Sequence, residues 1–579
     1  MTDRDFRIRL TLLWLLVSLL MIVLVRGNIA TNVLPDGDDY MRLQQVRDLL
    51  AGQSWFDLHQ YRYVPPVGAP THWSRLVDIP ITLLILIFRP FAGQIIAERL
   101  AEVMVPLLTL GCVMALLAII TRRLAGERPA FFAAALIPTA PLLWMQLQPL
   151  RIDHHGWQVV TALLMAQGVL DRRERRGGLI AGIAAATWLA ISLEGLPFAA
   201  AVSALLAWRW FREERPAGLE SFGWALAGTS FAYFAATQPG AAWAEVHCDS
   251  MSPPYLWALA VAAVGVALTC RLKLSKGWRL PVLGLVAIAA AAALGVTGPA
   301  CRSGPFAQLD PMVHKLWFQN VPEGLPVWTQ SLPVQMMILG FPLIGLLGAW
   351  LARARASAEQ RADWTNLIPL QLLSIAIAIM VQRTGAVETA LALPGGAWLI
   401  ATLAERAGKL TLPVTRIVAT AAVILLLAPL TLPLLANISF THEERAVEAA
   451  AGDTGCALPD NVAKLDALPA SNIASTFDLS ATIVSMTRHH VLATAHHRNV
   501  EGMKDLMVAF TRSPDIARAV LKRRKIDYVV LCRDINEVRV FTKLGPGGIV
   551  DRLSHGQTLD WLRPVPLQSH PQIGVWRVV

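Results

Sequence analysis

The feature that most constrains this chain is a series of apolar runs, each about 20 residues long, that recur from residue 8 to residue 436. A helix needs about that many apolar residues to cross the hydrocarbon core of a bilayer. Charged residues make up 16% of the chain, whereas a soluble domain carries roughly 25%. We therefore exclude a soluble enzyme, a disordered chain and a fibrous protein, and expect an all-α polytopic membrane domain.

The apolar runs predict about 13 membrane-spanning helices. The expected spans lie roughly at 8–26, 95–120, 129–147, 155–171, 178–193, 195–210, 218–237, 254–271, 278–297, 331–352, 364–382, 387–405 and 412–436. The stretch 79–92 is apolar but short, and a proline stands near each end of it, so it is either interfacial or the start of the second span. The first run lacks a small-residue cleavage site and is expected to be an uncleaved anchor.

Basic residues are divided unequally between alternate loops. One set of loops carries about 20 Lys and Arg and the other about 4, and the positive-inside rule places the richer set in the cytoplasm. The N-terminus is then cytoplasmic, and the segments 27–78 and 298–330, the loop around Asp153 and the tail lie outside. Because the basic residues stand between apolar runs, the net charge of +10 does not indicate a nucleic-acid partner.

The tail differs in composition from the rest of the chain. It is polar and mixes strand-like with helical runs, so we divide the chain into a membrane domain, 1–436, and a small α/β domain, 437–579. Ile526–Leu531 and Gly574–Val579 are typical of strands. Ser513 and Pro514 predict the start of a helix. We expect a bacterial inner-membrane protein whose small domain is periplasmic.

Four cysteines lie in the segments expected outside the membrane. Cys248 and Cys301 are in outer loops, and Cys456 and Cys532 are in the tail. An oxidising compartment would allow a disulfide within each pair. Four free thiols are an equally good interpretation, because pairing cannot be inferred from the sequence.

The first outer segment contains three closely spaced carboxylates. Asp36, Asp38 and Asp39 lie within four residues, and a divalent cation with oxygen ligands would relieve their repulsion. The alternative is a solvated acidic turn that caps the following helix. That helix has amphipathic spacing, ends near Gly52 and is expected to lie on the membrane surface.

Three further outer positions carry polar groups that are costly near a membrane unless they have partners. Asp153 and His155 can reach one ion from a turn, or Asp153 caps a helix beside interfacial histidines. The loop 298–330 is long enough to be functional and contains Glu323. Arg383 stands at the outer end of a span, where it is either a phosphate clamp or an interfacial anchor.

Together these groups suit a metal-assisted displacement with a phosphate leaving group. A cation screens the phosphate charge, and a carboxylate orients or deprotonates the acceptor. Nucleotide-activated sugars are not normally available outside the inner membrane. A transferase at this face therefore requires a donor that is already attached to a lipid carrier.

These motifs resemble those of the catalytic subunit of oligosaccharyltransferase and, more broadly, of the GT-C integral-membrane glycosyltransferases. The similar stretches are Asp38-Asp39-Tyr40 with Arg47–Gly52, Asp153-His154-His155, Ser303–Phe306, Leu309–Pro311, Val321–Glu323 and Arg383. The resemblance implies a GT-C-like fold, a polyprenyl-phosphate-linked sugar donor, a divalent metal (Mn or Mg) and inversion in one displacement.

The resemblance also implies a role for each site residue. The implied metal ligands are Asp38, Asp153, His155 and Glu323, of which Asp38 and Glu323 also act on the acceptor, and Arg383 contacts the donor phosphate. A register anchored on Arg42 puts Asp36 in the place of Asp38. The remaining candidates for substrate binding are Asp36, Asp39, Arg42 and His154.

One departure concerns the acceptor. The Trp-Trp-Asp sequence with which that family recognises the acceptor in N-glycosylation is absent from the tail. The acceptor is therefore left open as a glycan, a lipid or a protein group. The tail's histidines at 489–490 and 496–497 are interpreted as loop or surface residues in preference to metal ligands.

Two other functions compete with this interpretation. A surface-polysaccharide polymerase or ligase uses the same kind of donor, and a metal requirement would help to separate it. A transporter or flippase of lipid-linked glycans requires ionisable groups at mid-span and broken helices in paired halves. Few charges lie at mid-span, and Glu194, near the outer end of a span, is expected to face a cavity.

Overall fold

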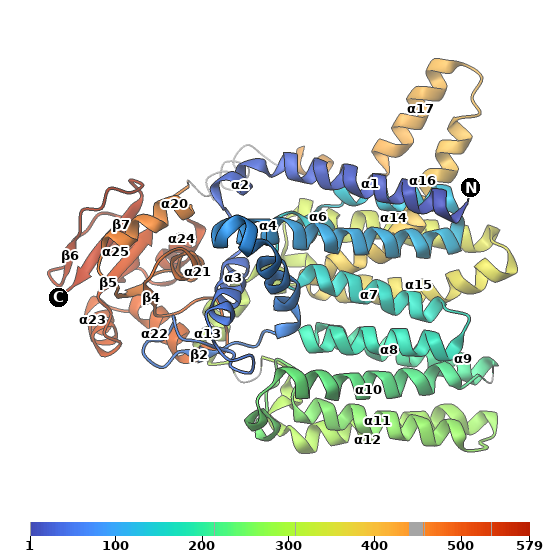
Figure 1. Cartoon of the computed structure of the whole chain (residues 1–579), viewed down its shortest axis with the longest axis horizontal. Helices are drawn as coiled ribbons and strands as arrows, with labels where there is room; N and C mark the ends of the chain where they lie inside the picture. Colours follow the sequence, from blue (N-terminus) through green and yellow to red (C-terminus); the bar gives the residue numbers. More distant parts are fainter. Residues whose placement is uncertain (1, 214, 307–308, 439–454, 457, 534) are drawn as a thin grey trace.

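The computed structural model of the protein is a bundle of long helices with a small α/β region at one end (Figure 1). The structure describes residues 2–213, 215–306, 309–438, 455–456, 458–533 and 535–579. The helices of the bundle are α1 (Asp3–Leu24), α4 (Arg75–Ala125), α5 (Glu127–Ala135), α6 (Pro141–Leu147), α7 (His155–Leu170), α8 (Glu174–Ile191), α9 (Leu196–Glu213), α10 (Ala217–Thr237), α11 (Pro253–Arg271), α12 (Lys276–Thr297), α14 (Leu332–Arg355), α15 (Ala358–Met380), α16 (Gly385–Ala407), α17 (Pro413–Leu426) and α18 (Thr431–Ile438).

The bundle is that of a multi-pass membrane protein. Among the described residues, 7 helices are long and apolar enough to cross a membrane, or 8 if α17 and α18, which bend by 80°, form one span. No residue of α12 or α17 is buried, so both present apolar side chains outward, as helices in contact with lipid do.

The expected count of about 13 spans is not confirmed. One reason is that some of the apolar runs form short or interrupted helices. The run 129–147 is divided into α5, a 3-10 turn at Ile137–Thr139, and α6. The run 155–171 forms α7, which has only 16 residues. The stretch 79–92 is the first part of α4, which breaks at Gly93, where φ is 76°.

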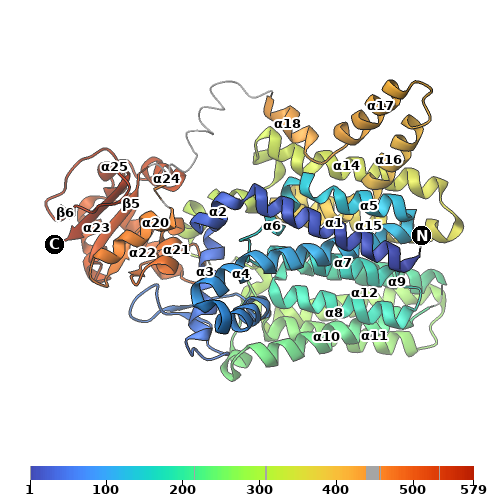
Figure 2. The same ribbon diagram turned by 45° about the horizontal axis from the view of Figure 1, so that its top comes forward.

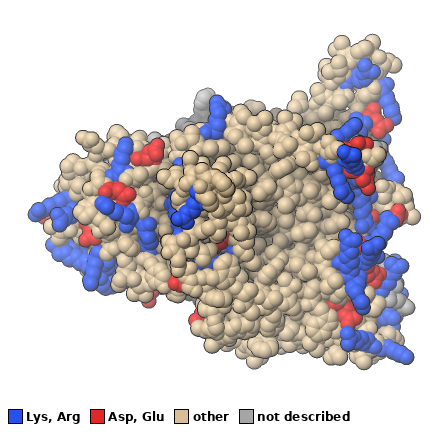
Figure 3. Space-filling view, in the orientation of Figure 1, with Lys and Arg blue, Asp and Glu red and all other residues tan. Residues whose placement is uncertain are grey.

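Charged side chains gather at the two ends of the bundle and leave an uncharged band between them (Figure 3). The N-terminus lies at the end opposite the α/β region in both ribbon views (Figures 1 and 2). Arg122 pairs with Asp3, and Arg123 pairs with Asp363, each at 2.8 Å. The basic loops that contain them therefore share one end of the bundle with the N-terminus, as the unequal charge of the loops predicted.

At the other end, the first outer segment forms α2 (Arg26–Thr31), α3 (Gly37–Leu50) and a short ribbon of β1 (His59–Gln60) paired with β2 (Ala69–Pro70). The helix expected on the membrane surface is α3, but eight consecutive residues of it, 39–46, are buried. It packs between α4 and α21 (Phe477–Met486). Arg47 joins all three, because its guanidinium contacts Glu98 at 2.8 Å and the carbonyl oxygen of Ser485 at 2.6 Å. The first part of this helix is thus enclosed by protein, and its position on the membrane surface stays a prediction.

The α/β region contains a five-stranded sheet. Its strands lie in the order β4 (His490–Val491), β3 (Asn472–Ala474), β5 (Tyr528–Cys532), β7 (Ile573–Val578) and β6 (Leu562–Pro564). The first three are parallel, and β7 is antiparallel to both of its neighbours. Helices α20 (Pro459–Val462), α21, α22 (Val500–Thr511), α23 (Pro514–Arg523), α24 (Asn536–Leu544) and α25 (Ile549–Ser554) accompany it.

Several local expectations in this region are confirmed. Strands β5 and β7 match the two predicted strands within two residues, and α23 begins with Ser513 at its N-cap. The short β4 carries part of the histidine-rich tail. The division of the chain at residue 436 stays a prediction.

Both cysteine pairs in the outer segments form disulfides. Cys248 is bonded to Cys301, with Cα atoms 5.0 Å apart, and Cys456 is bonded to Cys532, with Cα atoms 5.9 Å apart. The first bond ties the segment before α11 to the start of the long loop 298–330. The second bond ties the beginning of the α/β region to β5. Pairing, rather than four free thiols, is therefore the correct interpretation.

Candidate active site

The acidic turn and α3 form one unit. The Asp36 carboxylate accepts a hydrogen bond from the Asp38 backbone N–H at 3.1 Å, as an N-cap residue does. The cap places Asp38 and Asp39 in the first turn of α3, where the helix dipole favours negative charge. Asp36 thus caps the helix, whereas Asp38 and Asp39 lie in its first turn. The capped helix and the acidic cluster, which the sequence offered as alternatives, are both present.

Asp39 connects α3 to the loop before α7. One of its oxygens accepts the backbone N–H of Asp153, and the other accepts Arg151, each at 2.9 Å. Arg151 also pairs with Asp36 at 3.1 Å. Burial raises the pKa of Asp39 to about 7, although Arg151 opposes that rise. We infer that Asp39 and Arg151 position the neighbouring carboxylates.

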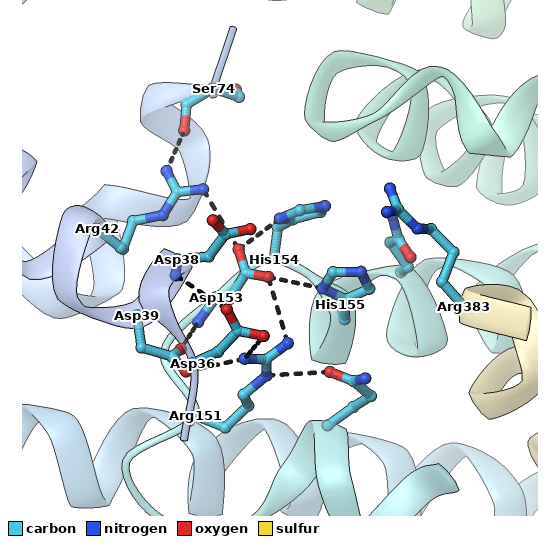
Figure 4. A network of polar contacts seen from close by, with 12 residues as sticks. Asp36, Asp38, Asp39, Arg42, Ser74, Arg151, Asp153, His154, His155 and Arg383 are labelled. Atoms are coloured by element: carbon cyan, nitrogen blue, oxygen red, sulfur yellow. Dashed lines mark hydrogen bonds and ion pairs between the residues drawn. The ribbon is translucent and has the colours of Figure 1, made fainter. Parts of the chain in front are cut away.

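Asp153 lies at the centre of the cluster and is 4% exposed. Its two oxygens lie 2.5 Å from Nδ1 of His154 and 2.6 Å from Nδ1 of His155 (Figure 4). Although burial raises the pKa of Asp153, the two histidines hold it well below the usual range. The carboxylate is therefore charged, and one donor atom from each of the three residues lies within 4.8 Å of the others.

Asp38 completes the acidic cluster. Its side chain points toward Asp153 and His154 in Figure 4. Its pKa is raised well above the ordinary value by burial and by the charges of Asp36, Asp153 and Glu323. These carboxylates, which are far apart in the sequence, are therefore close enough in space to repel one another.

Arg383 is held by two carboxylates from different segments. Its guanidinium contacts Glu323 at 2.6 Å and Glu194 at 3.2 Å. Gln158, one turn after His155 in α7, donates a hydrogen bond to the other oxygen of Glu194 at 3.0 Å. Arg383, the phosphate candidate, thus pairs with Glu323, one of the metal candidates, and α7 carries both Gln158 of this group and His155 of the Asp153 cluster. That Glu194 faces a cavity stays a prediction.

Arg42 has a different environment from the other candidates. It is fully buried, contacts Asp78 at 2.9 Å, and its guanidinium lies 4.2 Å from the ring centre of Trp73. It also lies 3.8 Å from Asp153. Its role in substrate binding stays a prediction. The contacts indicate that the positive charge of Arg42 stabilises the Asp153 carboxylate.

Sequence reasoning did not assign roles to Arg151, Gln158, Glu194 or Trp73. For Gln158 a signal existed, because a residue three positions after His155 in a helix faces the same side. For Arg151, its place two residues before Asp153 was the corresponding signal. Trp73 had none, since its contact with Arg42 depends on how the first outer segment folds back.

The residues fit a divalent metal ion. Asp153, His154 and His155 present a carboxylate and two imidazoles at the spacing that one ion needs, and such groups are ligands for Mg²⁺, Mn²⁺ or Zn²⁺. The assignment of Asp38 and Glu323 to the same ion stays a prediction. Within the described part of the chain, Nε2 of His155 is buried without a hydrogen-bond partner, and a metal ion would use its lone pair. The mutual repulsion that raises the pKa of Asp38 points to the same conclusion.

Comparison with solved structures identifies the fold. The archaeal oligosaccharyltransferase AglB from Archaeoglobus fulgidus, in complex with an inhibitory peptide and a dolichol-phosphate, has a TM-score of 0.65 and 15% identity over 96% of this chain and 72% of that chain. Its apo form has a TM-score of 0.66 and 14% identity over 97% and 74%. Its complex with Zn and sulfate has a TM-score of 0.60 and 15% identity over 93% and 70%. This chain has the GT-C fold.

The GT-C fold was expected from short motifs, and the likeness now covers nearly the whole chain. Sequence comparison found no matching family model and no matching curated protein. At identities near 15% the likeness establishes the fold alone, so the activity is argued from the geometry of this chain.

Asp39→Asn tests the positioning network. The variant keeps the shape of the side chain but weakens the contact with Arg151, so the loop that carries Asp153 is less firmly held. We expect metal affinity or transfer activity to fall by about 10- to 100-fold, with the fold retained. A metal titration of activity is the measurement. Asp48→Asn, in the same helix but outside this network, is the matched control, and equal behaviour of the two variants would contradict the role of Asp39.

Proposed function

We propose that this protein is a metal-dependent glycosyltransferase. It moves a sugar or an oligosaccharide from a polyprenyl-phosphate or polyprenyl-diphosphate donor to an acceptor at the periplasmic face of a bacterial inner membrane. The observation that carries the proposal is the meeting of Asp38, Asp153, His155, Glu323 and Arg383, from four segments, at one end of a GT-C fold.

The roles are those that the resemblance implies, and the contacts support them. Asp38, Asp153, His155 and Glu323 would hold the divalent metal, Mn or Mg, which when bound would screen the phosphate charge as the bond between sugar and phosphate breaks. Asp38 or Glu323 would orient the acceptor, and one of the two would take its proton. Arg383 binds the phosphate of the donor, and Glu194 fixes the direction of its guanidinium.

The nature of the donor follows from location and fold. The site lies at the end of the bundle that carries the α/β region, which we assign to the periplasm because the basic loops lie at the other end. Soluble nucleotide sugars are not normally present there. The similar archaeal enzyme was solved with a dolichol-phosphate, a carrier of the chemical class that we propose.

The acceptor is the less defined substrate. The archaeal enzyme was also solved with a tethered acceptor peptide, but this chain lacks the Trp-Trp-Asp sequence. We therefore keep a glycan, a lipid or a protein group as the acceptor, with a polysaccharide polymerase or ligase as the second candidate function. A transporter or flippase is less well supported, because the network gathers at one end of the bundle.

Mass spectrometry of lipid-linked sugars and surface glycans in a deletion strain tests the proposal. We expect a lipid-linked sugar to accumulate and a surface glycan to lose one component. A plasmid carrying the wild-type gene restores both, and one carrying Asp153→Asn does not. Unchanged lipid-linked sugars and unchanged glycans in the deletion strain would contradict the proposal.

A further inference from the structure

A second group of metal-binding residue types lies outside the candidate active site. It consists of His72, Asp249 and His497, and one donor atom from each lies within 4.8 Å of the others. His72 follows β2, Asp249 precedes α11, and His497 follows β4. Three segments that are distant in sequence thus bring two imidazoles and a carboxylate to one point.

The spacing is close to that of a metal site. Nε2 of His497 lies 2.8 Å from the Asp249 carboxylate, and the ring centres of His72 and His497 are 4.3 Å apart. Donor atoms held tetrahedrally by one zinc ion at about 2.1 Å lie about 3.4 Å apart. Binding an ion therefore requires the donors to move by on the order of an ångström, and the His497–Asp249 pair has to widen slightly.

One of the three candidate ligands, His72, has a ring nitrogen that is available to a metal ion. Nδ1 of His72 is buried and has no hydrogen-bond partner among the residues that the structure describes.

Arg498 and Ser250 fix this carboxylate in place. Arg498 donates to the two oxygens of Asp249 at 2.8 and 3.0 Å, and its guanidinium also lies 2.5 Å from the Ser250 hydroxyl. A carboxylate has about four lone-pair positions, so one stays open beside the three hydrogen bonds. A second opens when His497 exchanges its hydrogen bond for a metal. Carboxylates that bind metals are commonly oriented by such partners.

We propose that His72, Asp249 and His497 form a structural zinc site that is separate from the candidate active site. Two imidazoles and a carboxylate suit Zn²⁺, which takes nitrogen and oxygen ligands in tetrahedral sites. A water molecule or another ligand would fill the fourth position.

The place of the site explains what zinc does there. His497 belongs to the α/β region, and Asp249 adjoins Cys248, whose disulfide reaches the loop that carries Glu323. His72 precedes Trp73, on which Arg42 of the catalytic network stacks. Zinc at this point therefore fastens the α/β region to two outer segments of the membrane domain.

Zinc content of the purified full-length protein in detergent tests the proposal. The parent variant carries Asp153→Asn and His155→Asn, so that the active site does not contribute. After zinc loading and gel filtration we expect about one zinc per chain. Adding His72→Gln or His497→Gln should remove it. Adding His59→Gln, an exposed histidine in the same outer segment, should leave it bound.

Two results would overturn the proposal. One is a parent variant that retains no zinc, and the other is zinc that persists in both the His72→Gln and the His497→Gln proteins. If those two variants do not fold, X-ray absorption spectroscopy of the zinc bound to the parent variant tests the proposal. A spectrum with two histidine ligands supports the site, and a spectrum without them contradicts it. None of these measurements involves sugar transfer, so the outcome is independent of the proposed function.

Discussion

Asp153→Asn is expected to reduce sugar transfer by about 1,000-fold or more while the protein still folds. The Asp153 carboxylate accepts contacts from two imidazoles, at 2.5 and 2.6 Å, and it is the central charge of the cluster. Asparagine has the same shape, but it offers one acceptor oxygen and no charge. The metal would lose its most buried oxygen ligand, and His155 would lose the partner that orients its ring.

The measurement is the rate at which the purified protein transfers sugar from a lipid-linked donor at several metal concentrations. The control is Asp363→Asn, which also replaces a buried aspartate in an ion pair but lies in the basic end of the bundle. We expect that variant to keep activity within a few-fold of wild type. Asp153→Asn with activity equal to that control would mean that the cluster is not the catalytic centre.

Arg383→Lys is expected to lower kcat/KM for the donor by about 100-fold, with little change in the KM of the acceptor. A planar guanidinium makes paired contacts with Glu194, Glu323 and a phosphate, whereas a lysine ammonium acts as a point charge. The variant keeps the positive charge, so the two carboxylates are not left without a counter-ion.

Steady-state kinetics with the donor varied at fixed acceptor, and the reverse, separate the two effects. The matched control is Arg302→Lys, which changes an arginine of the outer loop that contacts only a backbone carbonyl among the interactions described. An equal loss for both substrates would indicate a structural role for Arg383. No loss would remove it from the donor site.

The sequence was sufficient to predict the GT-C fold and the parts of the site. Asp38, Asp153, His155, Glu323 and Arg383 were chosen from short motifs. The structure pairs His155 with Asp153 and Arg383 with Glu323, and it places Asp38 near both carboxylates. Local rules also predicted the cap of α23 and the strands β5 and β7. Each of these features depends on neighbours in sequence, or on motifs whose order was already familiar. Their chemical roles stay predictions.

Other features depend on long-range packing and were not predictable. Apolar composition indicates a membrane segment but not where its helix breaks, as at Gly93 or between α17 and α18. Amphipathic spacing indicated the helix α3, but not that α21 would cover it. The cluster of His72, Asp249 and His497 has no local pattern, because its three residues come from three distant segments.

The covering of α3 by α21 has a consequence for biogenesis. The contact between Arg47 and Ser485 joins residues 438 positions apart, so the acidic turn is enclosed by a helix that leaves the ribosome long after it. During synthesis the acidic turn therefore stays uncovered by α21 until that helix has been exported. A chain that terminates before α21 would retain every candidate ligand of the active site, but it would lack the helix that covers the acidic turn.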